Sequence, residues 1–179
     1  MYESTISVEM KEIITSLGGN QKVTDRFYLA GGTALALQLG HRKSVDLDFF
    51  SSSELDNRLI SDLFSECNGI VSHQDEKTIV GSVNAVHIAF FKYQYPVIQP
   101  FRNFESIRIA SIADIACMKT IAISQPAEKK DFFDMFEILQ LHSPKEVKAW
   151  LFRKYGPQKI NCHHILKSFF FFDDAEKTP

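Results

Sequence analysis

The sequence predicts an α+β protein in which strands and helices come first and helices alone follow. Short β-rich runs end by about residue 110, helical spacing of apolar residues continues from residue 111, and glycines separate the early elements. A length of 179 residues suits one compact domain, or a small core with an appended helical piece. We therefore expect an α/β core over residues 1–110 and a helical region over 111–179 that packs on it.

The strand, turn and helix around Gly31 form the most distinctive local unit. The apolar run 27–30 predicts a short strand, Gly31 and Gly32 a tight turn, and residues 33–40 a short helix that ends at its own glycine. The other expected elements are a helix over 6–17, a strand over 44–50, a helix around 55–64, a hairpin over 77–83 and 86–93, a strand over 107–109, and helices over 111–124, 129–141, 144–155 and 160–172, the last closed by the run Phe169 to Phe172.

The strand over 44–50 alternates in polarity, as a strand with one buried face does. Its apolar side comprises Val45, Leu47 and Phe49, and its polar side comprises Ser44, Asp46 and Asp48. Two carboxylates are therefore expected on one face.

Composition excludes several classes of protein. Lys and Arg total 20 and Asp and Glu total 22, so the formal charge is 20 − 22 = −2, and no block of one sign suggests double-stranded DNA or a membrane as partner. A hydrophobic fraction of 45% with 16 Phe excludes intrinsic disorder. The three cysteines lie far apart, which favours the reducing cytoplasm over a disulfide framework. The start of the sequence has no signal-peptide pattern and the apolar runs are too short for a bilayer, so we expect neither export nor a membrane span.

The glycine turn is a candidate phosphate site. A turn that opens a helix presents free backbone N–H groups and the positive end of the helix dipole to an anion. Thr33 is expected to cap this helix and to turn its hydroxyl toward the phosphates. The alternative is an ordinary strand-to-helix turn in which Thr33 is only the N-cap.

Asp46 and Asp48 are candidate metal ligands. Residues two apart on a strand share a face and lie about 6.6 Å apart, a separation from which two carboxylates can converge on one Mg²⁺. A cation would relieve the repulsion between the two charges and assist attack on phosphorus. The alternative is a solvent-facing strand with two exposed acids.

The segment GGTALALQLGHRKSVDLDFF, from Gly31 to Phe50, resembles the first motif of the AbiEii/AbiGii nucleotidyltransferase family of the DNA polymerase β-like superfamily. Two later stretches resemble further family motifs: 114–119, an acidic-x-x-x-Met-Lys pattern, and 130–136, a Lys-Asp-x-x-Asp pattern. The resemblance runs from about Phe27 to Leu139 and implies the minimal fold of that superfamily, a small mixed sheet flanked by helices and followed by a helical bundle.

The resemblance also implies a role for each matching residue. Nucleotide binding is implied for Gly31, Gly32, Thr33 and Asp114, and a catalytic role for Asp46, Asp48, Lys119, Asp131 and Asp134, with Asp46 and Asp48 as ligands of Mg²⁺. The residues alone also allow plainer roles for the later set. In these plainer roles, Asp114 is favourably placed by the dipole of its helix, Asp131 and Asp134 stabilise the start of the next helix, and Lys119 extends along the side of its helix.

A basic cluster precedes the acidic strand. Arg42, between His41 and Lys43, is expected to neutralise the charge of bound nucleotide or to steer an RNA end. The alternative is a solvated loop.

One departure concerns the third carboxylate that polymerase β-like transferases normally carry on a neighbouring strand. Ala89 stands where that acid is expected, and His87 is expected on the same face. His87 could serve as a base or ligand, or it could simply be a hydrogen-bonded strand residue.

These observations lead to three hypotheses. The first is a Mg²⁺-dependent enzyme that transfers a nucleoside monophosphate from an NTP to a hydroxyl; the resemblance implies an RNA acceptor such as a tRNA end and restraint by a cognate antitoxin. The second is a degenerate relative that binds nucleotide or a partner without turnover, which Ala89 motivates. The third is a structural or oligomerising domain that uses the Phe-rich C-terminal helix.

Overall fold

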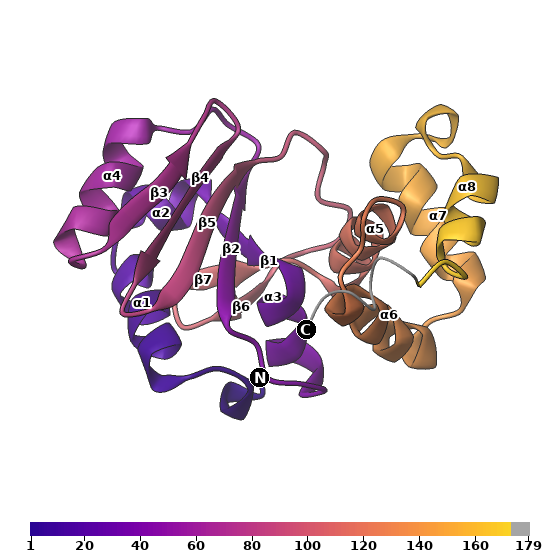
Figure 1. Cartoon of the computed structure of the whole chain (residues 1–179), viewed down its shortest axis with the longest axis horizontal. Helices are drawn as coiled ribbons and strands as arrows, with labels where there is room; N and C mark the ends of the chain where they lie inside the picture. The colour runs from indigo at the N-terminus through magenta and orange to yellow at the C-terminus, as the bar shows by residue number, and fades with distance from the viewer. Residues whose placement is uncertain (173–179) are drawn as a thin grey trace. The chain divides into compact units, whose positions relative to one another are not determined.

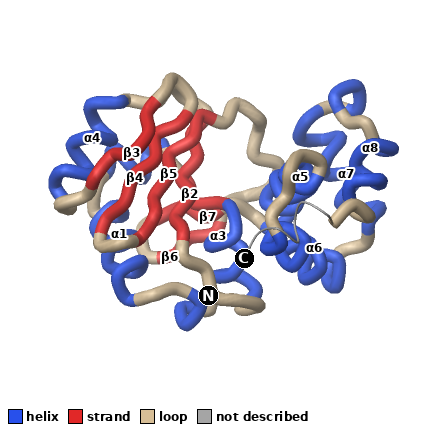
Figure 2. Tube along the Cα trace, viewed as in Figure 1, coloured by secondary structure: helices blue, strands red, loops and turns tan. Residues whose placement is uncertain are grey.

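The structure is a computed structural model that describes residues 1–172, so the last residues of the region expected over 111–179 lie outside the described part. The chain forms two compact units. Unit 1 comprises Met1–Pro96 and Phe101–Ala110, and unit 2 comprises Val97–Pro100 and the residues from Ser111 onward. Figure 2 shows that the strands belong to unit 1, whereas unit 2 consists of helices and loops.

Unit 1 contains a seven-stranded mixed sheet with the strand order β3-β4-β5-β2-β1-β7-β6. The pairs β2–β5 and β1–β7 are parallel, and the remaining pairs are antiparallel. Its elements are η1 (Glu3–Thr5), α1 (Val8–Gly18), α2 (Gln21–Arg26), β1 (Tyr28–Ala30), α3 (Gly31–Leu39), β2 (Asp46–Ser51), α4 (Asn57–Glu66), β3 (Ile70–Gln74), β4 (Thr78–Val83), β5 (Val86–Lys92), β6 (Arg102–Phe104) and β7 (Ile107–Ile109).

One face of the sheet carries the apolar core of unit 1. Leu47 and Phe49 on β2 have no exposed surface, and Phe49 stacks on Phe90 of β5 with ring centroids 5.2 Å apart. Helix α4 covers this face, where Phe64 meets the ring of Phe90 edge-on at 6.2 Å, and Figure 1 shows α4 beside β3 and β4. The alternate residues of β2 and β5 point to the other face.

The regular elements in the described part of unit 2 are all helices. It contains α5 (Ile112–Ile123), α6 (Lys129–Leu141), α7 (Pro144–Tyr155), η2 (Pro157–Lys159) and α8 (Cys162–Ser168). Ser111 and Ser143 cap α5 and α7, each accepting a hydrogen bond from the third backbone N–H of its helix. Ile115, Ile138 and Leu151 are buried between the helices.

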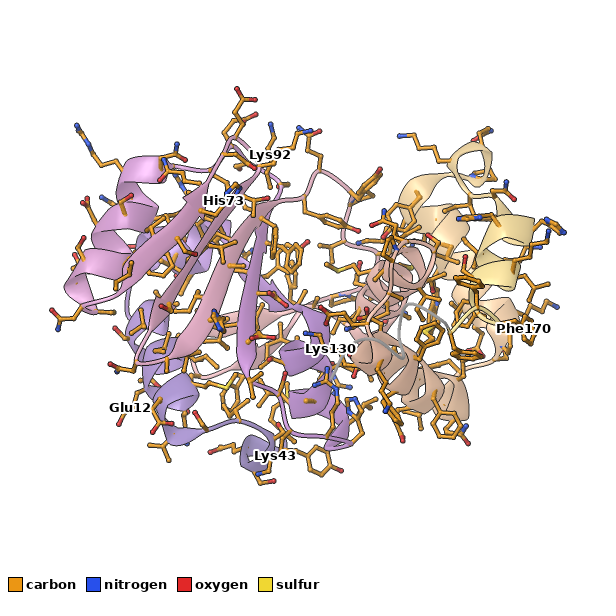
Figure 3. All side chains as sticks on the ribbon, in the orientation of Figure 1. Glu12, Lys43, His73, Lys92, Lys130 and Phe170 are labelled. Atoms are coloured by element: carbon orange, nitrogen blue, oxygen red, sulfur yellow. The ribbon has the colours of Figure 1, made fainter. Side chains whose placement is uncertain are left out.

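The expected order of elements is confirmed, with local corrections. The sequence pattern did not predict five short elements of the described residues, namely η1, α2, β3, β6 and η2. The acidic strand begins at Asp46 rather than Ser44, and Val45, expected in the core, is 69% exposed. The last helix ends at Ser168, so the phenylalanine run follows it, and Phe170 is 76% exposed (Figure 3).

Within residues 1–172, none of the helices has the length and apolar character needed to cross a membrane.

Candidate active site

The two carboxylates of β2 lie on one face of the sheet, opposite its apolar core. Asp46 and Asp48 are half-buried, while Leu47 between them is fully buried, as strand alternation requires. Strand β2 lies inside the sheet, paired with β1 on one side and β5 on the other. The predicted placement of the two acids on a common face is therefore confirmed.

The glycine turn lies directly beside Asp48. Ala30, the last residue of β1, pairs with Asp48 across the antiparallel ladder, and α3 begins at the next residue, Gly31. Gly31 has a φ of +69°, and a Cβ atom there would lie 2.5 Å from Oδ2 of Asp48. The turn and the carboxylate can pack this closely only because residue 31 has no side chain.

The N-terminus of α3 is also suited to an anion. No side chain caps the helix at Ala30, whereas Ser and Asp residues cap several other helices of the chain. The first backbone N–H groups of an α-helix have no partner within the helix, and the dipole makes this end positive. The turn at Gly31 and Gly32 thus places N–H donors next to the acid pair.

Thr33 is not the N-cap that the sequence suggested. It is the third residue of α3 and only 2% exposed. Its hydroxyl donates a hydrogen bond to the backbone carbonyl of Asp46, and its Oγ1 lies 2.7 Å from Oγ of Ser44. Thr33 therefore ties the start of α3 to the start of β2, and it helps to fix the position of the acid pair relative to the turn. Ser44 was not singled out in the sequence.

The basic segment His41–Lys43 joins α3 to β2. Arg42 is half-buried and its guanidinium donates a 3.0 Å hydrogen bond to the backbone carbonyl of Lys43. The ammonium group of Lys43 donates to the carbonyl of Ser4, which anchors this segment to η1. The nucleotide-binding role of Arg42 stays a prediction.

The parallel ladder between β2 and β5 shows what stands beside each acid. Asp46 pairs with His87, and Asp48 pairs with Ala89. His87 is exposed and shares the face of the acids, as expected, whereas Ala89 is 8% exposed. Strands β4 and β5 contain no Asp or Glu, so they supply no third carboxylate to this face.

In unit 2, Asp114 belongs to a buried ion pair. Its Oδ1 lies 2.7 Å from the ammonium group of Lys154, and both side chains are 1% exposed. The carboxylate also accepts hydrogen bonds from the backbone N–H groups of Ile98 and Gln99 at 3.0 and 3.3 Å, and from the hydroxyl of Ser111 at 2.7 Å. These partners give Asp114 a structural role in unit 2, and its nucleotide-binding role stays a prediction.

The other three family-motif residues of unit 2 form a second cluster. The ammonium group of Lys119 lies 2.7 Å from Oδ1 of Asp131 and 2.7 Å from Oδ2 of Asp134. Lys119 is 7% exposed and Asp134 is fully buried. Oδ2 of Asp131 also accepts from the backbone N–H of Glu128, as part of a capping box that begins α6. The ammonium group of Lys119 is thus shared between two carboxylates.

The structure therefore gathers the expected site residues into three groups. Gly31, Thr33, Asp46 and Asp48 lie together in unit 1; Lys119 joins Asp131 and Asp134 in unit 2; and Asp114 pairs with Lys154. A sequence signal for Lys154 exists, because it follows Val147 and Leu151 at helical spacing on the buried side of α7.

The acid pair fits Mg²⁺ as part of a larger coordination shell. Mg²⁺ takes oxygen ligands and is usually held by one or two carboxylates together with substrate phosphates and water. In residues 1–172, no three His, Cys, Asp or Glu side chains gather closely enough to hold a metal ion alone. Two carboxylates would therefore leave most of the coordination shell of such an ion to other oxygen ligands.

Comparison with known proteins identifies the family. Residues 17–100, which include the glycine turn, the acid pair and β5, match the family model described as the nucleotidyl transferase AbiEii toxin of type IV toxin–antitoxin systems. The uncharacterized protein aq_aa25 of Aquifex aeolicus (strain VF5) is 36% identical over 176 residues, which cover 94% of this chain and 82% of that protein. The chain belongs to the AbiEii nucleotidyltransferase toxin family.

Solved structures show that this AbiEii protein has the fold of the polymerase β-like nucleotidyltransferases. MenT4, a nucleotidyltransferase toxin of Mycobacterium tuberculosis H37Rv, matches with a TM-score of 0.61 at 15% identity, over 80% of this chain and 61% of MenT4. The antibiotic-resistance factor ANT(2″)-Ia matches with a TM-score of 0.60 at 12% identity, over 80% of this chain and 89% of that chain. A putative nucleotidyltransferase from H. pylori matches at 16% identity with a TM-score of 0.54, over 98% and 95% of the two chains. The predicted fold class is confirmed.

Proposed function

We propose that this AbiEii protein transfers a nucleoside monophosphate from an NTP to a hydroxyl group of RNA, with Mg²⁺ as cofactor and a tRNA end as the first acceptor to test. The observation that carries the proposal is the close packing of the Asp48 carboxylate against the Gly31 turn at the N-terminus of α3. Two carboxylates for a metal and an uncapped helix end for phosphates therefore lie side by side.

The proposed reaction requires few groups of the protein. The acceptor oxygen forms a bond to the α-phosphorus, the bond from that phosphorus to the oxygen bridging to the β-phosphate breaks, and pyrophosphate leaves with the electron pair while the hydroxyl proton passes to solvent. Bound Mg²⁺ would supply charge neutralisation at the phosphates. Asp46 and Asp48 would hold the ion, and the N–H groups at Gly31 and Gly32 would orient the triphosphate.

Supporting residues keep these groups in place. Thr33 fixes α3 to β2 through its hydrogen bond to Asp46, so the turn and the acids move as one body. Arg42 is proposed to meet phosphate charge from the segment between α3 and β2. Lys119, with Asp131 and Asp134, is proposed to contact phosphate or acceptor, as the family motifs imply.

Incubation with radiolabelled NTPs, one at a time, with Mg²⁺ and total tRNA tests the proposal. We expect label in RNA and released pyrophosphate, loss of both on addition of EDTA, and recovery with excess Mg²⁺. Asp46→Asn and Asp48→Asn should each lower the rate by about 100-fold or more, because each removes charge from the metal site. Asp62→Asn, an exposed change on α4, is the matched control. Equal incorporation by Asp46→Asn would overturn the proposal.

A second candidate function follows from Ala89, which stands beside Asp48 where a third carboxylate is expected. In this case the protein binds NTP without turnover. Calorimetry would then show NTP binding that requires Mg²⁺, while no acceptor becomes labelled. Labelled product from the unaltered protein excludes this candidate.

The family also suggests a cellular context. Its members are described as toxins of type IV toxin–antitoxin systems, so we propose that a cognate antitoxin restrains the transfer activity. Expression of this chain alone should slow bacterial growth, and Asp48→Asn should restore it. Growth arrest that persists with Asp48→Asn would separate toxicity from the acid pair.

A further inference from the structure

The face of the sheet in unit 1 that bears the acid pair also carries a strip of aromatic rings, which begins next to Asp48. The aromatic strip comprises Tyr28, Phe50, Phe91, Tyr93, Tyr95 and Phe101. Phe50 follows Asp48 by two residues on β2 and so shares its face. Phe91 is the partner of Phe50 in the β2–β5 ladder, and the two ring centroids are 5.0 Å apart.

The rings extend in both directions from Phe50. Toward β1, Tyr28 stacks on Phe50 at 6.0 Å, and Phe101 lies 5.0 Å beyond Tyr28. Toward the end of β5, Tyr93 meets Phe50 at 5.6 Å, and Tyr95 lies 5.3 Å from Tyr93. The strip is thus longer than the area on which a single nucleotide base can stack.

Sheet stability accounts for only part of this strip. Cross-strand aromatic pairs such as Phe50 and Phe91 do stabilise a sheet. Tyr95, however, lies past the end of β5, outside the ladder, and is 39% exposed. On the covered face, by contrast, the rings of Phe49 and Phe90 are almost wholly buried. Within the strip, Tyr28 is 6% exposed and belongs to the packing of the sheet, whereas Phe50, Phe91, Tyr93 and Phe101 are half-buried, so part of the aromatic surface stays accessible.

Charge at one end of the strip suits a phosphate backbone. The guanidinium carbon of Arg108 lies 5.0 Å from the ring centroid of Phe101, and Arg102, next to Phe101 in the chain, is exposed. Proteins that bind unpaired nucleic acid combine such cations with aromatic side chains on which successive bases stack.

We propose that the aromatic strip binds the unpaired bases at the 3′ end of the acceptor RNA and so brings its terminal hydroxyl to the acid pair. This inference rests on the proposed function, because it names the feature of the acceptor that the same site recognises. An NTP offers one base, whereas the strip offers more than one ring that is at least partly exposed. The protein therefore selects acceptors by the single-stranded character of their ends and tolerates different sequences, since every base has a face that can stack.

Direct binding tests the strip without any chemistry. Fluorescence anisotropy compares a labelled single-stranded RNA with a blunt duplex of the same sequence. We expect the duplex to bind roughly 10-fold more weakly, and Phe91→Leu and Tyr93→Leu each to weaken single-strand binding roughly 10-fold. Phe133→Leu, which alters a 56% exposed ring in unit 2, is the matched control. Equal affinity of Phe91→Leu, Tyr93→Leu and the unaltered protein would overturn the inference, as would equal affinity for the duplex.

Transfer kinetics test it independently. In the strip variants, KM for RNA should rise while kcat and KM for the NTP stay unchanged. A rise in KM for the NTP alone would assign the rings to the incoming base and overturn the inference. Circular dichroism and melting midpoints identify variants that fail to fold, and Tyr93→Leu, which lies beyond β5, remains informative if Phe91→Leu is unstable.

The outcomes separate the two proposals. Ring-dependent RNA binding without any transfer by the unaltered protein contradicts the proposed function alone. Transfer with an unchanged KM for RNA in the strip variants contradicts this inference alone.

Discussion

At the scale of single residues, the backbone conformation of Gly31 directly affects the proposed chemistry, because this residue packs against the Asp48 carboxylate. Gly31→Ala would place a Cβ atom 2.5 Å from the carboxylate of Asp48 and hold a non-glycine residue at a φ of +69°. We expect the transfer rate to fall roughly 10-fold or more, because the carboxylate of Asp48 must move. The free energy of unfolding should fall by about 1–2 kcal/mol, because the backbone at residue 31 becomes strained. Steady-state rates and urea denaturation measure the two effects.

Gly156→Ala is the control for that change. Gly156 also has a positive φ, +83°, but its Cβ would meet only Oε1 of Gln158, at 3.6 Å. This variant should lose stability without losing activity. If both variants keep full activity, the close contact of the turn with Asp48 has no functional role.

The hairpin between β4 and β5 contains the opposite case, a strained residue that glycine would relieve. Asn84 and Ala85 have φ values of 48° and 63°, as a two-residue hairpin turn with two left-handed positions requires. Ala85→Gly should raise stability by about 1 kcal/mol, because glycine adopts this conformation without a steric cost. A melting midpoint at or below that of the unaltered protein would contradict this.

At the scale of elements, the buried ion pair between α5 and α7 should dominate the stability of unit 2. Lys154→Met leaves the carboxylate of Asp114 buried without its cation, and we expect a loss of about 3–5 kcal/mol. Urea denaturation followed by circular dichroism measures it. Lys145→Met, an exposed change at the start of the same helix, should cost about 0.5 kcal/mol or less. A similarly small loss of unfolding free energy in both variants would show that the other hydrogen bonds of Asp114 are enough to stabilise its buried carboxylate.

The elements that the sequence predicted well are those with a strong apolar pattern. Strand β2 and helix α4 show clear periods, because each buries one side against a core. Strand β3 was missed because its residues are mostly exposed, so that hydrophobic alternation is absent at this edge of the sheet. Helix α2 has six residues and one buried side chain, Val23, too few to show a period.

The candidate site was predictable to the extent that it depends on local order. The common face of Asp46 and Asp48 follows from strand alternation alone, and the turn at Gly31 follows from its glycines. The role of Thr33 did not follow, because its partner is a backbone carbonyl thirteen residues later. The pairing of Asp114 with Lys154 depends on the packing of two helices, which spacing within one helix cannot reveal.

At the scale of the whole molecule, the three cysteines should differ widely in reactivity. Cys117 is fully buried, and burial raises the pKa of its thiol to about 12, although the nearby Lys154 charge opposes this rise and the Asp114 charge adds to it. Cys162 is exposed and Cys67 is half-buried. Alkylation at pH 8 followed by mass spectrometry should modify Cys162 first and leave Cys117 unmodified until the protein unfolds. Rapid modification of Cys117 in the native protein would contradict its burial.

The same thiol predicts how stability depends on pH. A raised pKa means that the folded state keeps the proton that the unfolded state releases, so the contribution of Cys117 is complete below its ordinary pKa of 9.0 and is lost as the pH rises toward about 12. Between these values, the free energy of unfolding should fall by about 1.4 kcal/mol per pH unit relative to Cys117→Ala. Parallel curves for the two proteins would show that the thiol does not titrate differently on folding.

The interior position of β2 has a consequence for how an ion is taken up. Hydrogen-bonded neighbours on both sides hold the backbone of Asp46 and Asp48 before any ligand arrives. Capture of a divalent cation therefore costs little chain entropy, in contrast to calcium loops that become ordered as they load. Deuterium uptake by the amides of this strand should accordingly be equally slow with and without magnesium.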